Sequence, residues 1–236
     1  MFAPAFTLDH VAKRYIRGDE VVPIFDDLTM TIAEGDFVAL MGPSGSGKTT
    51  LLNLLGGIDR ADAGTMAYRS ERFDQLREAS LAQWRARHVA FVFQAFNLLP
   101  MLSAARNVEL PLTLTRLPAR ERRRRVATAL DLVGLSECAS REPAQLSGGQ
   151  QQRVAIARAI VADTDVLLCD EPTGNLDRAA STDILELLQM LNRELNKTIV
   201  MVTHDALAAD HAKVVLHLDK GRFDADAVRQ PQLVDA

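Results

Sequence analysis

The distribution of apolar and polar residues near the N-terminus is typical of short strands. Three such stretches are FTLDHVA (6–12), VVPIFDDLTMTIA (21–33) and DFVALM (36–41). The third leads directly into a glycine-rich loop, and the leucine-rich run after that loop predicts a helix that ends at Gly56 and Gly57. The pattern therefore predicts a strand, a glycine loop and a helix in that order.

The middle of the chain has a helical pattern from about Leu98 to Ala162. It includes PARERRRRVATALDLVG, with Pro118 expected in the first turn of a helix and Gly134 at its end. Two later apolar runs, 165–172 and 198–205, flank the helical pattern of 181–195. This arrangement is expected for buried parallel strands in a βαβ unit, so the pattern predicts an α/β fold with a helical insertion.

Composition restricts the possible function classes. The 236 residues can form one domain, and the net charge of −4 argues against nucleic acid as a partner. The longest charge-free apolar stretch, 89–105, contains polar residues and a proline, which does not suit a membrane-spanning helix. No signal peptide is predicted, and the spacing of Cys138 and Cys169 suits a reducing cytoplasm rather than a metal site.

The glycine loop GPSGSGKT, from Gly42 to Thr49, fits the phosphate-binding pattern G-x-x-x-x-G-K-[ST] between a predicted strand and a predicted helix. Its glycines let backbone N–H groups surround phosphates. Lys48 is expected to reach the β- and γ-phosphates, and the Thr49 hydroxyl is expected to bind Mg²⁺. The sequence therefore predicts a nucleotide site.

Two carboxylates end the apolar strand VLLCDE (166–171). Asp170 suits the Mg²⁺ shell, and Glu171 suits deprotonation of the attacking water, because ligands bind at this edge of open α/β sheets. The plainer alternative is a pair of solvent-exposed acids. His204 follows another such strand and is expected to donate to the γ-phosphate, although a lone histidine is often structural.

A second anion site is predicted at LSGGQQQ (146–152), where Ser147 and two glycines precede a helical pattern. A solvated helix face is the expected role of the arginine run 120–125, with attraction to anionic lipids as the alternative. The segment AFNLLPML is expected to expose an apolar partner surface. Its large side chains are those of Phe96, Leu98, Leu99, Met101 and Leu102.

The order of these motifs resembles the ATP-binding cassette ATPases. The matching parts are the phosphate loop, Gln94 after an apolar strand, LSGGQ (146–150), the strand before Glu171, GNLD (174–177) and His204. The resemblance implies a P-loop NTPase core of RecA type with a mainly parallel sheet, an N-terminal antiparallel β part and an inserted helical part. It covers nearly the whole chain as one domain, with the core and β lobe at about 5–95 and 163–222, the helical signature lobe at about 96–162 and a tail at 223–236.

The resemblance also implies that two copies pack head to tail, so that the signature segment of one copy closes over ATP held by the other. It implies that Tyr15 stacks on adenine, that Gln94 contacts Mg²⁺ or the attacking water, and that Asp177 reaches the partner's phosphate loop. The implied Mg²⁺ contacts are Thr49, Gln94 and Asp170. The implied ATP contacts are Tyr15, Gly42, Pro43, Ser44, Gly45, Ser46, Gly47, Lys48, Thr49, Thr50, Ser147, Gly148, Gly149, Gln150 and Asp177.

The segments GGIDRADAGT, FVFQAFNLLPMLSAARNVELPL and DEPTGNLD are similar to the ATPases of macrolide exporters, of lipoprotein release and of cell division. This similarity implies an ATPase subunit on the cytoplasmic face of the bacterial inner membrane that drives export or membrane extraction through a separate permease. For export, the similarity also implies a periplasmic adaptor as a partner. The alternative is a cell-division cassette that transmits motion to cell-wall hydrolases. One departure is MAYRSERFD, which lacks the usual turn glycine and leaves that local loop in question.

Overall fold

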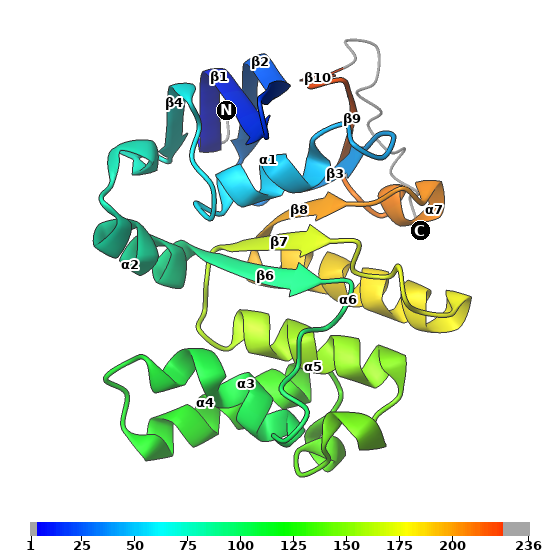
Figure 1. Ribbon diagram of the computed structural model, residues 1–236. Helices are drawn as coiled ribbons and strands as arrows, with labels where there is room; N and C mark the ends of the chain where they lie inside the picture. The colour runs from blue at the N-terminus through cyan, green and yellow to red at the C-terminus, as the bar shows by residue number, and fades with distance from the viewer. Residues whose placement is uncertain (1–3, 224–236) are drawn as a thin grey trace.

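The computed structural model describes residues 4–223 and builds them around a six-stranded sheet (Figure 1). The strand order is β10-β9-β3-β8-β7-β6, and all neighbouring pairs are parallel except β9 with β10. The central strands are continuous apolar runs, because both faces of the sheet are covered. Their bounds are β3 Phe37–Met41, β6 Val89–Phe93, β7 Val166–Asp170, β8 Thr198–Val202, β9 Val214–Asp219 and β10 Arg222–Phe223.

A second, antiparallel sheet has the order β2-β1-β4-β5 and lies beyond α1, at the top of Figure 1. Its strands are β1 Pro4–Arg17, β2 Glu20–Ala33, β4 Ala63–Tyr68 and β5 Glu71–Arg72. The turn between β4 and β5 forms without a glycine. Arg69 takes the left-handed conformation there, with φ 53°, and its side chain bonds to Glu34. The missing glycine therefore leaves the hairpin intact.

The six-stranded sheet separates two apolar cores, because successive residues of a strand point to opposite faces. In β7, Leu167 and Cys169 pack with the helices α3 to α6, whereas Val166 and Leu168 pack toward α1 and the antiparallel sheet. The helices outside the helical insertion are α1 Lys48–Leu55, α2 Glu78–His88, α6 Arg178–Leu195 and α7 Ala206–Ala209, with a 3-10 turn, η1 Phe73–Gln75.

The helical insertion between β6 and β7 forms the lower part of the molecule in Figure 1. Its elements are α3 Ala104–Thr113, α4 Ala119–Leu132, η2 Ser136–Cys138, η3 Pro143–Gln145 and α5 Gly148–Ile160. Helix was predicted from Leu98, but 95–103 is a loop: Phe96 and Asn97 have φ of 58° and 50°, and Pro100 has no N–H to donate in a helix. Pro118 precedes α4 as its N-cap residue, with ψ 150°, instead of lying in the first turn.

The predicted fold class is confirmed: an α/β core with a mainly parallel sheet, an antiparallel β part and inserted helices. Within 4–223 no helix combines the length and apolarity needed to span a bilayer. Nearly all of the predicted tail, 223–236, lies outside the described residues. The arginine run is an ion-paired helix face, since Arg122 pairs with Glu109 while Arg124 and Arg125 pair with Glu121.

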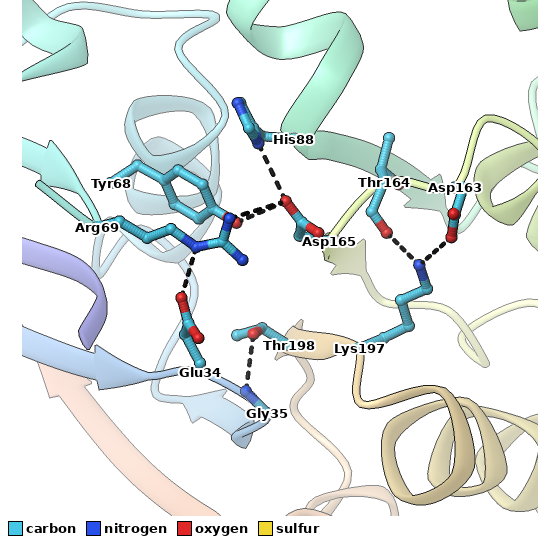
Figure 2. A network of polar contacts seen from close by, with 10 residues as sticks. All are labelled: Glu34, Gly35, Tyr68, Arg69, His88, Asp163, Thr164, Asp165, Lys197 and Thr198. Atoms are coloured by element: carbon cyan, nitrogen blue, oxygen red, sulfur yellow. Dashed lines mark hydrogen bonds and ion pairs between the residues drawn. The ribbon is translucent and has the colours of Figure 1, made fainter. Parts of the chain in front are cut away.

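A polar network joins the two sheets at the amino ends of β7 and β8 (Figure 2). The Asp165 carboxylate accepts from the Tyr68 hydroxyl at 3.0 Å and contacts His88 Nδ1 at 3.1 Å, and Arg69 lies 3.7 Å away. These residues come from β4, its following turn and α2. The network therefore fixes the antiparallel sheet against the core at the edge opposite the carboxyl ends of the parallel strands.

Candidate active site

The loop 42–47 joins β3 to α1 and leaves the first turn of that helix open. Gly47 is the N-cap residue with φ 103°, and a Cβ there would lie 2.9 Å from Ile24 and from the Phe25 ring. Glycine is therefore required by both conformation and space. No side chain caps α1, so its first backbone N–H groups point toward any bound anion.

Lys48 is the first residue of α1 and folds back over the loop. Its Nζ donates to the carbonyl oxygens of Gly42 and Pro43, both at 2.8 Å. An ammonium group and a helix N-terminus thus occupy one place, which is the electrostatic arrangement that phosphate needs.

The carboxylates of Asp170 and Glu171 lie where β7 ends, next to the loop. Burial raises the pKa of Asp170, and the neighbouring charge of Glu171 raises it further, whereas a hydrogen bond from Thr49 and the charge of Lys48 lower it. Two adjacent carboxylates around a threonine hydroxyl favour a divalent cation, which would remove their repulsion.

Glu171 has a left-handed backbone, with φ 50°, while its N–H donates to the Val202 carbonyl of β8 at 3.0 Å. A non-glycine residue in this conformation costs free energy, and such strain gathers at functional sites. His204 Nδ1 lies 2.9 Å from the Glu171 carboxylate, and this hydrogen bond with the carboxylate charge raises the pKa of His204. The Glu171 carboxylate thus lies against a histidine that follows the neighbouring strand, β8.

Gln94 follows β6 and bonds to Asn175. Its Nε2 donates to Asn175 Oδ1 at 3.1 Å, and Asn175 Nδ2 donates back to the Gln94 carbonyl at 3.0 Å. The segment after β6 and the GNLD segment are therefore joined by a reciprocal pair of hydrogen bonds. Sequence reasoning did not single out Asn175, although it lies within the GNLD motif.

A cavity of about 680 Å³ brings most of the predicted residues together. This volume lies in the range of small-molecule sites. The predicted residues that line it are Gly42, Ser44, Gly45, Gly47, Lys48, Thr49, Thr50, Gln94, Asp170, Glu171 and His204. The other predicted residues lie outside its lining: Tyr15, Pro43, Ser46, Ser147, Gly148, Gly149, Gln150 and Asp177.

The signature segment caps helix α5 on a separate part of the chain. Ser147 Oγ accepts from the Gln150 N–H, and Gln150 Oε1 accepts from the Ser147 N–H at 3.0 Å. Asp177 similarly caps α6 by accepting from the Ala180 N–H at 2.9 Å. The two predicted anion sites are therefore not joined within one copy of the chain.

Sequence reasoning missed three polar residues: Arg158 and Asn107 hold the loop after Gln94, and Gln152 holds the segment after β7. Arg158 of α5 donates to the carbonyl oxygens of Phe96 and Asn97, and burial lowers the pKa of this arginine. Asn107, fully buried on α3, bonds to Leu99 at both its N–H and its carbonyl. Gln152 of α5 donates to the Pro172 carbonyl at 2.6 Å. A polar residue within an apolar helix face is the only sequence signal for them.

The predicted apolar surface after Gln94 is smaller than expected. Leu98 packs against the helical core, and Phe96 and Leu102 are half-buried, so the tertiary fold covers part of the segment. Leu99 and Met101 remain exposed, at 43% and 69%.

The site fits a nucleoside triphosphate with Mg²⁺. The open helix terminus and Lys48 suit phosphate oxygens, while Thr49 and Asp170 offer hard oxygen ligands. Among the described residues, no cluster of three or more His, Cys, Asp or Glu side chains could hold a metal by itself. Thr49 and Asp170 are enough protein ligands for Mg²⁺, which commonly takes one or two of them and completes its shell with phosphate and water.

The family profile described as ABC transporter matches residues 25–174. The chain belongs to the ABC transporter family. The resemblance that the motif order indicated is confirmed, and with it ATP hydrolysis, the use of ATP with Mg²⁺, and pairing of cassettes, as properties of the family to which this cassette belongs.

Curated relatives of the cassette include both long and short proteins. The macrolide export ATP-binding/permease protein MacB of Sodalis glossinidius is 45% identical over 226 residues, which are 96% of this chain and 34% of that protein. The chain thus spans about a third of that relative's length. The uncharacterized ABC transporter ATP-binding protein YvrO of Bacillus subtilis is 46% identical over 222 residues, covering 93% of this chain and 96% of that protein.

Solved structures show the same architecture. The cassette MJ0796, in a dimeric post-hydrolysis state bound to ADP and Pi, superposes with a TM-score of 0.86 at 38% identity, covering 96% of this chain and 99% of that one. A second dimeric structure of MJ0796 gives a TM-score of 0.85 at 40% identity, with 93% and 96% coverage.

Proposed function

We propose that this cassette is the ATPase subunit of an exporter or membrane-extraction machine, acting with a separate permease on the cytoplasmic face of the bacterial inner membrane. The observation that carries the proposal is the separation of two half-sites on one chain. The phosphate loop lies in a cavity with Glu171, while the signature segment opens α5 outside that cavity. The name of the MacB relative, a macrolide export protein, supports export, and the substrate is proposed to be a drug, a peptide or a lipoprotein.

In this proposal the loop 42–50 binds the phosphates, and Thr49, Asp170 and Gln94 hold Mg²⁺, which would polarise the γ-phosphate. The Glu171 carboxylate accepts a proton from the attacking water. His204 donates to the γ-phosphate, and its bond with Glu171 supports a protonated ring.

The site is completed by a second copy of the chain. Ser147, Gly148, Gly149 and Gln150 of that copy close over the γ-phosphate, and its Asp177 approaches the phosphate loop. The N-terminus of α5 supports this role, because its helix dipole and the backbone N–H groups of its first turn suit an anion, with the Ser147 hydroxyl placed beside them as the cap. A symmetric pair then contains two composite sites.

The permease is proposed to bind in a groove between the sheet edge and the helical insertion. This groove has a volume of about 680 Å³ and is lined by apolar residues that include Phe91, Leu112 and Leu114. Phe93 and Asn97 line both this groove and the nucleotide cavity. A partner in the groove would therefore contact the wall of the nucleotide site.

The catalytic role is tested with Glu171→Gln. This variant is expected to bind Mg·ATP like the wild type, to lose hydrolysis by on the order of a hundredfold, and to accumulate as an ATP-bound dimer on gel filtration. Glu194→Gln, an exposed change in the last turn of α6, is the control. Wild-type hydrolysis by Glu171→Gln, or failure to dimerise with ATP, would contradict the assignment.

The permease surface is proposed to extend from the groove, which Asn97 lines, to the exposed Leu99, and it is tested with Leu99→Glu. Leu195 is equally exposed, at 42% against 43% for Leu99, but lies at the end of α6, so Leu195→Glu is the matched control. Leu99→Glu is expected to keep ATP binding and the thermal melt of the isolated subunit while losing co-purification with the permease. A lowered melting temperature would instead indicate that Leu99 serves only internal packing.

A further inference from the structure

Two segments far apart in sequence meet beside the nucleotide cavity. Lys13 and Tyr15 belong to β1, and Asp59 lies in the segment that follows α1. Lys13 is buried, with 6% of its surface exposed, whereas 39% of Tyr15 is exposed. A buried lysine needs a compensating charge, and Asp59 is that charge.

The Asp59 carboxylate uses both oxygens in this cluster. Oδ1 accepts from Lys13 Nζ at 2.7 Å, and Oδ2 accepts from the Tyr15 hydroxyl at 2.6 Å. Burial raises the pKa of Asp59, but the hydrogen bonds from Lys13 and Tyr15 outweigh it and hold the pKa below its usual value. The carboxylate is therefore charged near neutral pH and binds both partners.

The Tyr15 ring is held at its hydroxyl and along one face. Lys13 Nζ lies over the ring, 4.8 Å from its centroid. This cation–π contact restricts rotation of the ring in addition to the bond at the hydroxyl. A ring that is fixed before the ligand arrives loses less conformational entropy on stacking.

The same helix supports both the phosphate loop and Asp59. The first turn of α1 carries Lys48, Thr49 and Thr50, which line the nucleotide cavity, and the Asp59 N–H donates back to the carbonyl of Asn53 in that helix at 3.2 Å. Thr50 also lies beside the Tyr15 hydroxyl: burial and Asp59 raise the pKa of this hydroxyl, and Thr50 lowers it. Helix α1 therefore links the phosphate end of the site to the tyrosine ring.

We propose that Asp59, together with Lys13, is a positioning residue that fixes the Tyr15 ring for stacking on the nucleobase. The inference rests on the proposed nucleotide site and on the stacking role of Tyr15. Asp59 acts through Tyr15 and contacts no phosphate. Its contribution therefore depends on the base and is absent for a ligand that has only phosphates.

The test compares binding of Mg·ATP and of magnesium tripolyphosphate by calorimetry, in wild type, Asp59→Ala, Tyr15→Ala and the double variant. Loss of aromatic stacking on a base is expected to weaken ATP binding about tenfold. Asp59→Ala is expected to weaken ATP binding by a comparable factor, to leave tripolyphosphate binding unchanged, and to have no further effect in the Tyr15→Ala background.

The control is Asp62→Ala in the same segment, since the Asp62 carboxylate accepts from the Arg14 N–H at 2.6 Å and forms no bond to Tyr15. It is expected to leave the ratio of the two affinities unchanged. If Asp59→Ala weakens binding of both ligands equally, the inference is overturned. It is also overturned if the wild type binds ATP and Asp59→Ala binds it with the same affinity. A wild type that binds neither ligand would overturn the nucleotide site itself, and the inference with it.

Discussion

Gly45 and Gly47 show how differently two glycines of one loop are constrained. Both have left-handed backbones, with φ of 78° and 103°. A Cβ on Gly47 would collide with Ile24 and the Phe25 ring, whereas one on Gly45 would meet nothing within 4 Å. Sequence reasoning treats both as parts of one motif, but only Gly47 is also packed against the antiparallel sheet.

Gly47→Ala is therefore expected to destabilise the protein more than Gly45→Ala. The left-handed conformation costs each variant about 1 kcal/mol, and the collision adds about 1–3 kcal/mol for Gly47→Ala alone. In thermal melts without nucleotide, Gly47→Ala should have a melting temperature several degrees lower than that of Gly45→Ala. Equal melting temperatures would mean that the Phe25 ring moves aside without cost.

Among the elements, the amino end of β7 joins β4 and α2 to the core through Asp165 (Figure 2). Burial raises the pKa of Asp165, but hydrogen bonds with His88 and Tyr68 and the charge of Arg69 outweigh this and lower it below the ordinary 3.8. A carboxylate whose pKa is lower in the folded state stabilises that state above its unfolded pKa. This stabilisation is lost as the pH falls through the folded value.

Asp165→Asn is expected to reduce the free energy of unfolding at neutral pH by about 1 kcal/mol, a value limited by the partial exposure of the side chain. The difference from wild type should shrink as the pH falls below about 4. Urea unfolding at several pH values, followed by the fluorescence of Trp84, the single tryptophan, measures the free energy of unfolding and its pH dependence. Asp26→Asn is the control, since Asp26 is exposed on β2 and its side chain makes no hydrogen bond or ion pair within the described part of the chain. If the difference in free energy of unfolding between Asp165→Asn and wild type grew as the pH fell, the expected direction of the pKa shift of Asp165 would be wrong.

At the scale of the whole molecule, one copy holds a phosphate cavity and a signature segment that do not meet. Ser147 caps α5 outside the lining of the cavity that contains Lys48. If the site is composite, Ser147→Arg and Lys48→Ala damage different halves of it. A mixed dimer then keeps one undamaged site.

Mixing Ser147→Arg with Lys48→Ala in equal amounts is expected to restore about a quarter of wild-type ATPase, because half of the dimers are mixed and each has one undamaged site. Each variant alone should be inactive. The measurement is phosphate release against mixing ratio, with each variant mixed with itself as the control. If mixed dimers form but the mixture recovers no ATPase activity, the two composite sites do not work independently.

The sequence determined the features that depend on neighbouring residues. The strand, glycine loop and helix around Lys48 follow from local periodicity and glycine placement, and the apolar strand before Asp170 follows from its burial on both faces. These local signals were enough to indicate the fold class and the family. Helix α2 left no comparable signal, and the start of the helical insertion was predicted at about Leu98, whereas its first helix begins at Ala104.

Only the tertiary structure decided which distant side chains meet. Tyr15 and Asp59 are 44 residues apart, and Arg158 bonds to a carbonyl 61 residues earlier. Periodicity reports which face of an element is apolar, but it contains no information on the partner of a buried polar group. That partner is set by how the elements pack, because a buried charge or amide is stable only where packing places a complementary group within hydrogen-bond distance.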